Sequence, residues 1–333
     1  MRIGLLDDDT VLEAITLAGR APSVHNSQPW RWRVGETALH LYADWSRHVP
    51  VTDRDGRDLV VSCGAALHHL RVALAALGWG GTVRRLPDPD DPKHLASVRL
   101  FARRPRADDI ALLSTIPARR SDRRLYSSWP VPEQLLDKLA RFAAAQGCAL
   151  RVVADPVPRE DLLTAIADAD REQRDDPRYR DELAQWSGRR SGSRDGVLSE
   201  VSTTVHPRPG DVRLRQFADP TLGEPEGAYA DPDKGVLLVI GTAKDDMTAR
   251  LRAGEAASAV LLRATSFQLA SCLLSQPLET PRTRALVQQR VLGGALFPQL
   301  VLRVGWAHVT AEPLPASPRR AASEITEPLG PRQ

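Results

Sequence analysis

Three segments of the sequence carry side chains that could bind a small molecule. The first, residues 21–30, reads Ala-Pro-Ser-Val-His-Asn-Ser-Gln-Pro-Trp and lies between a predicted helix and a polar loop. Its prolines and small residues expose backbone groups beside Ser23 and Asn26, whose side chains can hydrogen-bond the polar edge of a planar heterocycle. A tight turn anchored by Asn26 and Trp30 explains the same residues equally well. His25 is interpreted as a turn residue rather than a catalytic base.

The other two segments are rich in arginine. Residues 119–124 read Arg-Arg-Ser-Asp-Arg-Arg, and Arg319 and Arg320 follow Pro318 near the C-terminus. Guanidinium groups on both sides of a serine offer charge-assisted donors that suit a phosphate and its neighbouring hydroxyls. A solvated basic loop and a basic tail are the commoner origins of such runs, so the sequence leaves both interpretations open.

Composition excludes several classes of protein. The chain has 333 residues, 42% of them hydrophobic and 26% charged, which is typical of a globular protein of roughly two domains. With 45 basic and 42 acidic residues, nucleic-acid binding is not expected. No apolar run is long enough for a membrane helix and no signal peptide is recognisable, so we expect a cytoplasmic protein without membrane attachment. The three cysteines are far apart and no HExxH occurs, so no metal site is expected.

Generic catalytic patterns are missing from the sequence. It contains no GxGxxG after a strand, no GxxxxGK[ST] loop and no GxSxG elbow. Paired carboxylates such as Asp245 and Asp246 stand at predicted helix starts, where the helix dipole favours them for structural reasons. The sequence therefore names no catalytic acid, base or nucleophile.

Hydrophobic periodicity predicts the elements that must position these segments. The expected helices cover residues 10–20, 58–77, 132–147, 245–274 and 280–289, and the expected strands cover residues 38–44, 94–102, 149–155, 235–241 and 299–304. A charged, irregular stretch is expected at about 156–234, between the strands at 149–155 and 235–241. The alternation of helices and strands predicts an α+β fold.

Two repeats are recognisable along the chain. Residues 38–44 (Ala-Leu-His-Leu-Tyr-Ala-Asp) are similar to residues 149–155 (Ala-Leu-Arg-Val-Val-Ala-Asp) at an offset of 111. A Gly-x-Ala motif occurs in the long helices at Gly64 and at Gly254, at an offset of 190. The difference, 190 − 111 = 79 residues, predicts an insertion in the second repeat at about 156–234.

The repeats predict how the chain is organised. We expect two tandem units, residues 1–107 and 108–333, that form an intramolecular pseudo-dimer with a central sheet in each unit and long helices between them. Long inserted segments of such composition are usually lids, binding loops or disordered. The helical spacing of Tyr179, Leu183 and Trp186 favours a partly ordered lid.

The motifs resemble those of the nitroreductase family of FMN-dependent oxidoreductases. The similarity rests on Ala-Pro-Ser-x-x-Asn-x-Gln-Pro-Trp after a first helix, on Arg119-x-Ser121-x-Arg123, and on a closing strand at residues 302–306 followed by Pro318-Arg319-Arg320. The loop motif occurs only in the first unit and the arginine–serine motif only in the second. This division is similar to the actinobacterial Acg-type branch, in which two degenerate nitroreductase halves are fused and a segment covers the flavin.

The resemblance implies an FMN site built from both units. It assigns the ribityl phosphate and the pyrimidine side of the flavin to Arg119, Ser121 and Arg123, with Arg120 in the same motif. The flavin ring is assigned to Pro22, Ser23, Val24 and Asn26, and the remaining phosphate contacts to Arg319 and Arg320. Ser275 and Gln276 fall near the flavin N5 in a loose alignment.

The resemblance also implies an activity. Hydride is expected to pass from NAD(P)H through the flavin to an aromatic, nitro or quinone-type acceptor. An alternative from another class is an FMN-sequestering or storage protein whose lid covers the flavin and permits little or no turnover. Because the two motifs are divided between the units, one chain is expected to bind one FMN and to be able to act as a monomer.

Overall fold

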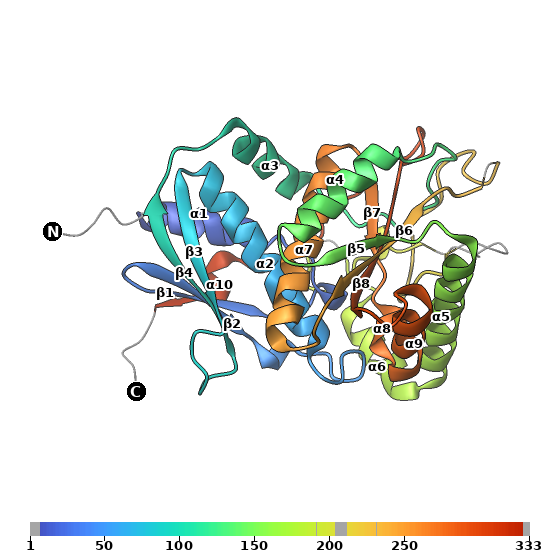
Figure 1. The fold of residues 1–333 in the computed structure, drawn as a ribbon, viewed down its shortest axis with the longest axis horizontal. Helices are drawn as coiled ribbons and strands as arrows, with labels where there is room; N and C mark the ends of the chain where they lie inside the picture. Colours follow the sequence, from blue (N-terminus) through green and yellow to red (C-terminus); the bar gives the residue numbers. More distant parts are fainter. Residues whose placement is uncertain (1–6, 191, 204–211, 231, 329–333) are drawn as a thin grey trace.

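A computed structural model describes residues 7–190, 192–203, 212–230 and 232–328. It contains two separate sheets with two long helices between them (Figure 1). The first unit contributes α1 (Asp8–Ala18), β1 (Trp30–Val34), β2 (Ala38–Ala43), α2 (Arg57–Ala76), β3 (Trp79–Arg85) and β4 (His94–Ala102). The expected α+β class is confirmed.

The rest of the chain supplies the second sheet and its helices. In chain order these elements are α3 (Ala107–Ala118), α4 (Glu133–Ala144), β5 (Ala149–Val152), α5 (Pro156–Asp175), α6 (Pro177–Trp186), β6 (Val236–Thr242), α7 (Met247–Ser266), β7 (Ala270–Leu273), α8 (Gln276–Glu279), α9 (Pro281–Leu286) and β8 (Phe297–Gly305). A π-helical turn, Val287–Val291, precedes β8, and α10 (Ala322–Ile325) and β9 (Thr326–Pro328) end the described chain.

The two sheets have the same topology. The first has the order β3-β4-β2-β1-β9 and the second has the order β7-β8-β6-β5, and every pairing is antiparallel except that of β9 with β1. By position, β5 therefore corresponds to β1, and β6 corresponds to β2. The similarity between residues 38–44 and 149–155 is consequently not a structural equivalence, because an alternating apolar pattern fits any half-buried strand.

The topology also shows where the extra segment of the second unit lies. The extra segment of the second unit lies between β5 and β6, where the first unit has only the turn between β1 and β2. The expectation of an irregular stretch at 156–234 is wrong for its first part, because α5 and α6 are regular helices. Leu162 and Ile166 of α5 pack against Leu237 and Val239 of β6, so α5 belongs to the core of the second unit. The Pro-Arg-Pro-Gly run at 207–210 of the same stretch lies outside the described residues.

Hydrophobic periodicity missed several elements and extended one helix too far. The strands β1 and β3 and the helix α3 were not expected, and the helix expected through Leu274 ends at Ser266. A turn follows in which Gln268 adopts a positive φ of 62°, and the apolar residues after it form β7 rather than a further helical turn. A continuous apolar run does not distinguish a helix from a buried strand.

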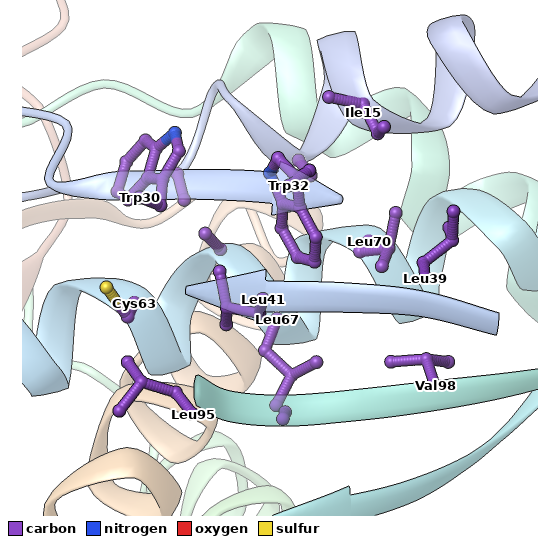
Figure 2. Packing of buried hydrophobic residues seen from close by; sticks show 14 of the residues in the cluster. Ile15, Trp30, Trp32, Leu39, Leu41, Cys63, Leu67, Leu70, Leu95 and Val98 are labelled. Carbon is purple, nitrogen blue, oxygen red and sulfur yellow. The ribbon is translucent and has the colours of Figure 1, made fainter. Parts of the chain in front are cut away.

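The core of the first unit lies between its sheet and α2. Trp30 and Trp32 of β1 are completely buried and face the helix, as Figure 2 shows with Leu41 of β2 and Leu67 and Leu70 of α2. Alternate residues of β1 point to this core, which is the two-residue periodicity of a half-buried strand. Truncation of either tryptophan to alanine would cost about 3–5 kcal/mol.

The helices α2 and α7 cross where both carry a glycine. A Cβ atom added to Gly64 would collide with the carbonyl oxygen of Leu251, and one added to Gly254 would collide with the carbonyl oxygen of Val61. Only glycine allows two helix backbones to approach so closely. By length and composition α2 could also span a membrane, but 83% of that stretch is buried inside the protein. It is the central helix of the fold.

The C-terminal segment returns to the first unit. Strand β9 pairs in parallel with β1, and Ala322 and Ile325 of α10 pack in the first core. Residues that the sequence assigns to the second unit therefore complete the first sheet. Arg319 reaches the 21–30 loop for this reason.

Candidate functional site

A cavity lies where the two units and the inserted segment meet. The space inside it measures about 1220 Å³ when the part open to solvent is included. Its walls come from the 21–30 loop, α2, the 119–123 segment, the inserted segment, β7 with the residues after it, and the C-terminal segment. It combines apolar side chains with a few buried polar groups, as small-molecule sites do.

The 21–30 loop enters this cavity in a strained conformation. His25, Asn26 and Gln28 have φ values of 48°, 55° and 53°, in the left-handed region that side chains other than glycine rarely adopt. The loop is held by a hydrogen bond from the Gln28 amide to Ser23 Oγ (2.9 Å) and by one from the Val24 amide to Ser62 Oγ of α2 (3.3 Å). Such strain persists only where the surroundings enforce it, and it is typical of ligand sites.

Asn26 joins three segments of the chain. Its Nδ2 donates to the carbonyl oxygens of Gly196 (3.0 Å) and Pro318 (3.1 Å), and its Oδ1 accepts from Arg319 Nη1 (2.9 Å). Both N–H groups are therefore used within the protein and none remains for a heterocycle. The expected hydrogen bond from Asn26 to a planar ligand does not fit this geometry, although the residue lines the cavity.

Four guanidinium groups, those of Arg20, Arg119, Arg120 and Arg319, form what we call the arginine cluster. Nε and Nη1 of Arg119, Nε of Arg20 and Nε of Arg319 are buried without a hydrogen-bond partner. Within the described chain, the charges that act on Arg119 and Arg319 are those of other arginines alone. Burial and this mutual repulsion lower the pKa of Arg119 to about 10 and that of Arg319 to about 9.

Unpartnered buried donors of this kind are costly. Each leaves a desolvation penalty of roughly 1–3 kcal/mol, and more where the group is charged. An anion with several acceptor oxygens would remove that penalty and the repulsion together. The arginine cluster therefore has the chemistry of a phosphate site.

The inserted segment brings a further arginine to the cavity, and both of its Nη groups have partners. Arg215 forms an ion pair with Glu279 and donates to Tyr179 Oη (2.8 Å), Ser275 Oγ (3.2 Å) and His25 Nε2 (3.2 Å). We call these five residues the Arg215 network. Since a guanidinium can only donate, His25 Nε2 must accept, so the imidazole is neutral with its proton on Nδ1. Burial and the charges of Arg215 and Arg123 hold the pKa of His25 well below its usual range.

A buried carboxyl group also lines the cavity. Asp58, in the first turn of α2, is 4% exposed, and its Oδ1 lies 2.6 Å from Arg57 Nη2 in an ion pair. Neither carboxylate oxygen accepts a hydrogen bond from the described residues. Burial raises the pKa of Asp58 above the usual range of an aspartic acid, against the opposing charge of Arg57.

The structure brings together most of the residues that the sequence singled out. The cavity is lined by Pro22, Ser23, Val24, Asn26, Arg119, Arg120, Ser121, Arg123, Ser275, Gln276 and Arg319. Arg320 is the exception. Its Nη2 donates to the carbonyl oxygen of Glu324 and its Nη1 lies 3.8 Å from Asp44, so its side chain is directed to other groups. Arg120 lines the cavity, but its Nε and Nη1 donate to backbone carbonyls.

Sequence reasoning missed several residues of the site. Asp58 begins the long apolar helix next to Arg57, and that buried pair of charges was a usable signal. His25 was assigned to a turn, which is correct for its backbone but omits its place in the cavity. Arg215 and Phe217 had no local signal, because they lie in a long segment without periodicity.

Comparison with known proteins places the chain in a family. No family model matches it. It is 46% identical over 321 residues to a Mycobacterium tuberculosis H37Rv protein named "Putative NAD(P)H nitroreductase Rv3131", covering 96% of this chain and 92% of that protein. The chain belongs to the NAD(P)H nitroreductase family. A second nitroreductase of the same organism, named "Putative NAD(P)H nitroreductase acg", is 36% identical over 330 residues, covering 96% of each chain.

Solved nitroreductase structures are more distant. The FMN-dependent nitroreductase NfnB from Mycobacterium smegmatis, in complex with NADPH, has a TM-score of 0.41 and 19% identity, covering 65% of this chain and 97% of its own. A likeness at this level carries no argument about this chain. The assignment to the nitroreductase family rests on the sequence relatives and agrees with the resemblance of the motifs.

Proposed function

We propose that the cavity holds one FMN per chain and that the protein passes hydride from NAD(P)H to an aromatic, nitro or quinone-type acceptor. The observation that carries this proposal is the arginine cluster, in which N–H groups of Arg20, Arg119 and Arg319 are buried without partners. A phosphate ester supplies the missing acceptor oxygens and negative charge. Membership in the nitroreductase family makes FMN the phosphate ester of choice. Bound FMN would supply a two-electron carrier that also exchanges single electrons.

The residues of the chain divide the work of holding this cofactor. Arg119 and Arg319 would neutralise the phosphate, with Ser121 beside them. Ser23 and Val24, together with the neighbouring Pro22, Arg123, Ser275 and Gln276, would surround the remainder of the molecule. Asn26 would act through the loop it holds in place. Arg320 is assigned no contact.

The two units would form an intramolecular pseudo-dimer. The glycine crossing supports this, because Gly64 meets Leu251 while Gly254 meets Val61, and 254 − 64 and 251 − 61 both equal 190. Reciprocal contacts of this kind are those of a two-fold interface. The identical order of β1–β4 and β5–β8 supports it further. Such a chain needs no second copy to complete its site, and we place it in the cytoplasm.

The inserted segment would cover the site as a lid. Gln28 Nε2 donates to the carbonyl oxygen of Arg194 (2.9 Å), and Arg47 pairs with Asp195 (2.5 Å). Gly196, Val197 and further residues of this segment line the cavity. These contacts also favour a second candidate function, in which the cover seals a sequestered FMN and turnover is slight.

Anaerobic mixing of the purified protein with NADH and with NADPH separates the two functions. An oxidoreductase is expected to lose its flavin absorption within seconds, and a sequestering protein to keep it for minutes. Flavin released from the denatured protein, compared with protein concentration and with mass by light scattering, gives the stoichiometry. One FMN per monomeric chain is expected. Two per chain, or loss of FMN when dimers are diluted, would refute the pseudo-dimer.

A further inference from the structure

We propose that Asp58 is the proton donor of the cavity. This inference rests on the proposed function, and it concerns a group to which neither the motifs nor the relatives assign a role. Reduction of a quinone-type acceptor by two electrons adds one hydride and one proton. The hydride originates from NAD(P)H, whereas the proton needs a separate source inside a covered cavity.

The position of Asp58 suits this task. The residue lies in the first turn of α2, next to Ser62, whose Oγ accepts from the Val24 amide of the 21–30 loop. Asp58, Ser62 and Val24 all line the cavity. No group in the described part of the chain donates a hydrogen bond to either oxygen of the Asp58 carboxyl.

The charged groups around Asp58 favour a proton among the buried acids here. The charged groups that act on Asp58 are Arg57 beside it, Asp53 in the preceding turn, Glu279 of α8 and Arg215 of the inserted segment. Two guanidinium groups thus face three carboxyl groups. A proton on one carboxyl removes the excess negative charge from an environment that solvates it poorly.

The hydrogen bonds indicate which carboxyl carries that proton. Asp53 accepts from the backbone amides of Asp58 (2.9 Å) and Leu59 (2.8 Å), which stabilises its charged form. Glu279 accepts from Arg215 and from Gln173 Nε2 (2.5 Å). Asp58 accepts no hydrogen bond from the described residues; Arg57 Nη2 lies 2.6 Å from its Oδ1, and the charge of Arg215 also acts on it. The proton therefore rests on Asp58.

The proton step balances without a further reactant. The O–H bond of the Asp58 carboxyl breaks and a new O–H bond forms on the acceptor, which has received the hydride. The resulting carboxylate is stabilised by Arg57 until it takes a proton from water. An acceptor that takes electrons alone requires none of this, and that difference provides the test.

The experiment compares two electron acceptors in the FMN-loaded protein after the flavin has been reduced with dithionite. Benzoquinone takes up a proton with its electrons, whereas ferricyanide takes electrons only. In Asp58→Asn, reoxidation by benzoquinone should slow by on the order of 10²-fold, while reoxidation by ferricyanide stays unchanged. Asp58→Glu should restore the quinone rate in part. A matched control is Asp170→Asn, which alters an equally buried acid outside the cavity and should change neither rate.

Equal slowing with both acceptors, or no slowing with benzoquinone, would overturn the proposal. An infrared spectrum of the unmodified chain gives a readout apart from turnover and independent of any variant that fails to fold. It should contain the band of a protonated carboxyl group at neutral pH, and its absence overturns the assignment. A chain that retains no FMN refutes the proposed function, and loss of the infrared band in Asp58→Asn then tests the protonation of Asp58 separately.

Discussion

Arg119 and Arg215 line the same cavity and have largely buried side chains, yet they differ in what surrounds them. Arg119 is 6% exposed, has two N–H-bearing nitrogens without partners and is surrounded by other arginines. The guanidinium of Arg215 pairs with the carboxylate of Glu279. It also donates hydrogen bonds to the side chains of Tyr179, Ser275 and His25. The folded chain stabilises the first charge poorly and the second well.

This difference distinguishes a residue that holds the fold together from a residue that is available to bind a ligand. A buried charge that the fold satisfies holds segments together, and its loss exposes its partner to the cost of an unpaired group. A buried charge without partners destabilises the fold, and the rest of the structure must offset that cost. A ligand that supplies the missing acceptor atoms would remove the cost. Four substitutions test this distinction.

The largest effect is expected from Arg215→Ala. It leaves the Glu279 carboxylate, whose side chain is 1% exposed, without its cation, and it should lower the free energy of unfolding by about 3–5 kcal/mol. Urea unfolding of the FMN-free chain measures this. The double variant Arg215→Met with Glu279→Gln should recover a large part, because no unpaired charge remains. A single variant within about 0.5 kcal/mol of the wild type would show that the network does not hold the inserted segment.

Arg119→Met should behave in the opposite way. It removes a charged donor from the phosphate and should weaken FMN binding by about 1.5–3 kcal/mol. It breaks no hydrogen bond of the described chain, so the melting temperature of the FMN-free protein should stay the same or rise. Flavin content after purification and fluorescence titration of FMN measure the first effect. Full flavin content in the variant would contradict the phosphate assignment.

A smaller effect concerns the response of His25 to pH. Its pKa is lowered in the folded chain, so between pH 6.5 and that lower value the unfolded chain binds a proton that the folded chain does not. The free energy of unfolding should therefore fall as the pH decreases below 6.5, by about 1.4 kcal/mol per pH unit from this residue. The substitution His25→Asn introduces a side chain that also tolerates a positive φ but does not titrate in this range. It should reduce the slope of the free energy of unfolding against pH by that amount. Parallel curves for variant and wild type would exclude His25 as the source.

The smallest effect is expected from Arg320→Ala. Its guanidinium is directed to Glu324 and Asp44 and not to the cavity, so FMN content should remain close to that of the wild type. The neighbouring Arg319→Ala is the matched comparison and should lose FMN. Equal loss in both variants would show that the two residues act together and would place Arg320 at the phosphate.

Much of the candidate site could be predicted from local sequence. The residue types at 22–26 and 119–123, with Arg319, indicated heterocycle and phosphate binding, and these segments meet in one cavity. The long helices were also predictable, because their apolar positions repeat at the helical period. The Gly64 and Gly254 motifs were visible as a repeat, although nothing in the sequence showed that they touch.

The roles of Asn26, Arg215 and Asp58 could not be predicted, because a group's role depends on which partners it lacks or has. Asn26 bonds a carbonyl 292 residues away in the chain, and Arg215 bonds an imidazole 190 residues away. Periodicity describes neighbours within a few turns and contains no information about such contacts.

The sequence by itself determined the α+β class, the long central helices and the choice of segments for the proposed phosphate and heterocycle site, because these depend on side-chain chemistry and on local repeat. Tertiary structure alone decided that β5 corresponds to β1, that α5 belongs to a core and that Arg320 is directed away from the cavity. It also decided which buried charges are satisfied. That property depends on dielectric environment and on partners from distant segments, and both arise only when the chain is folded.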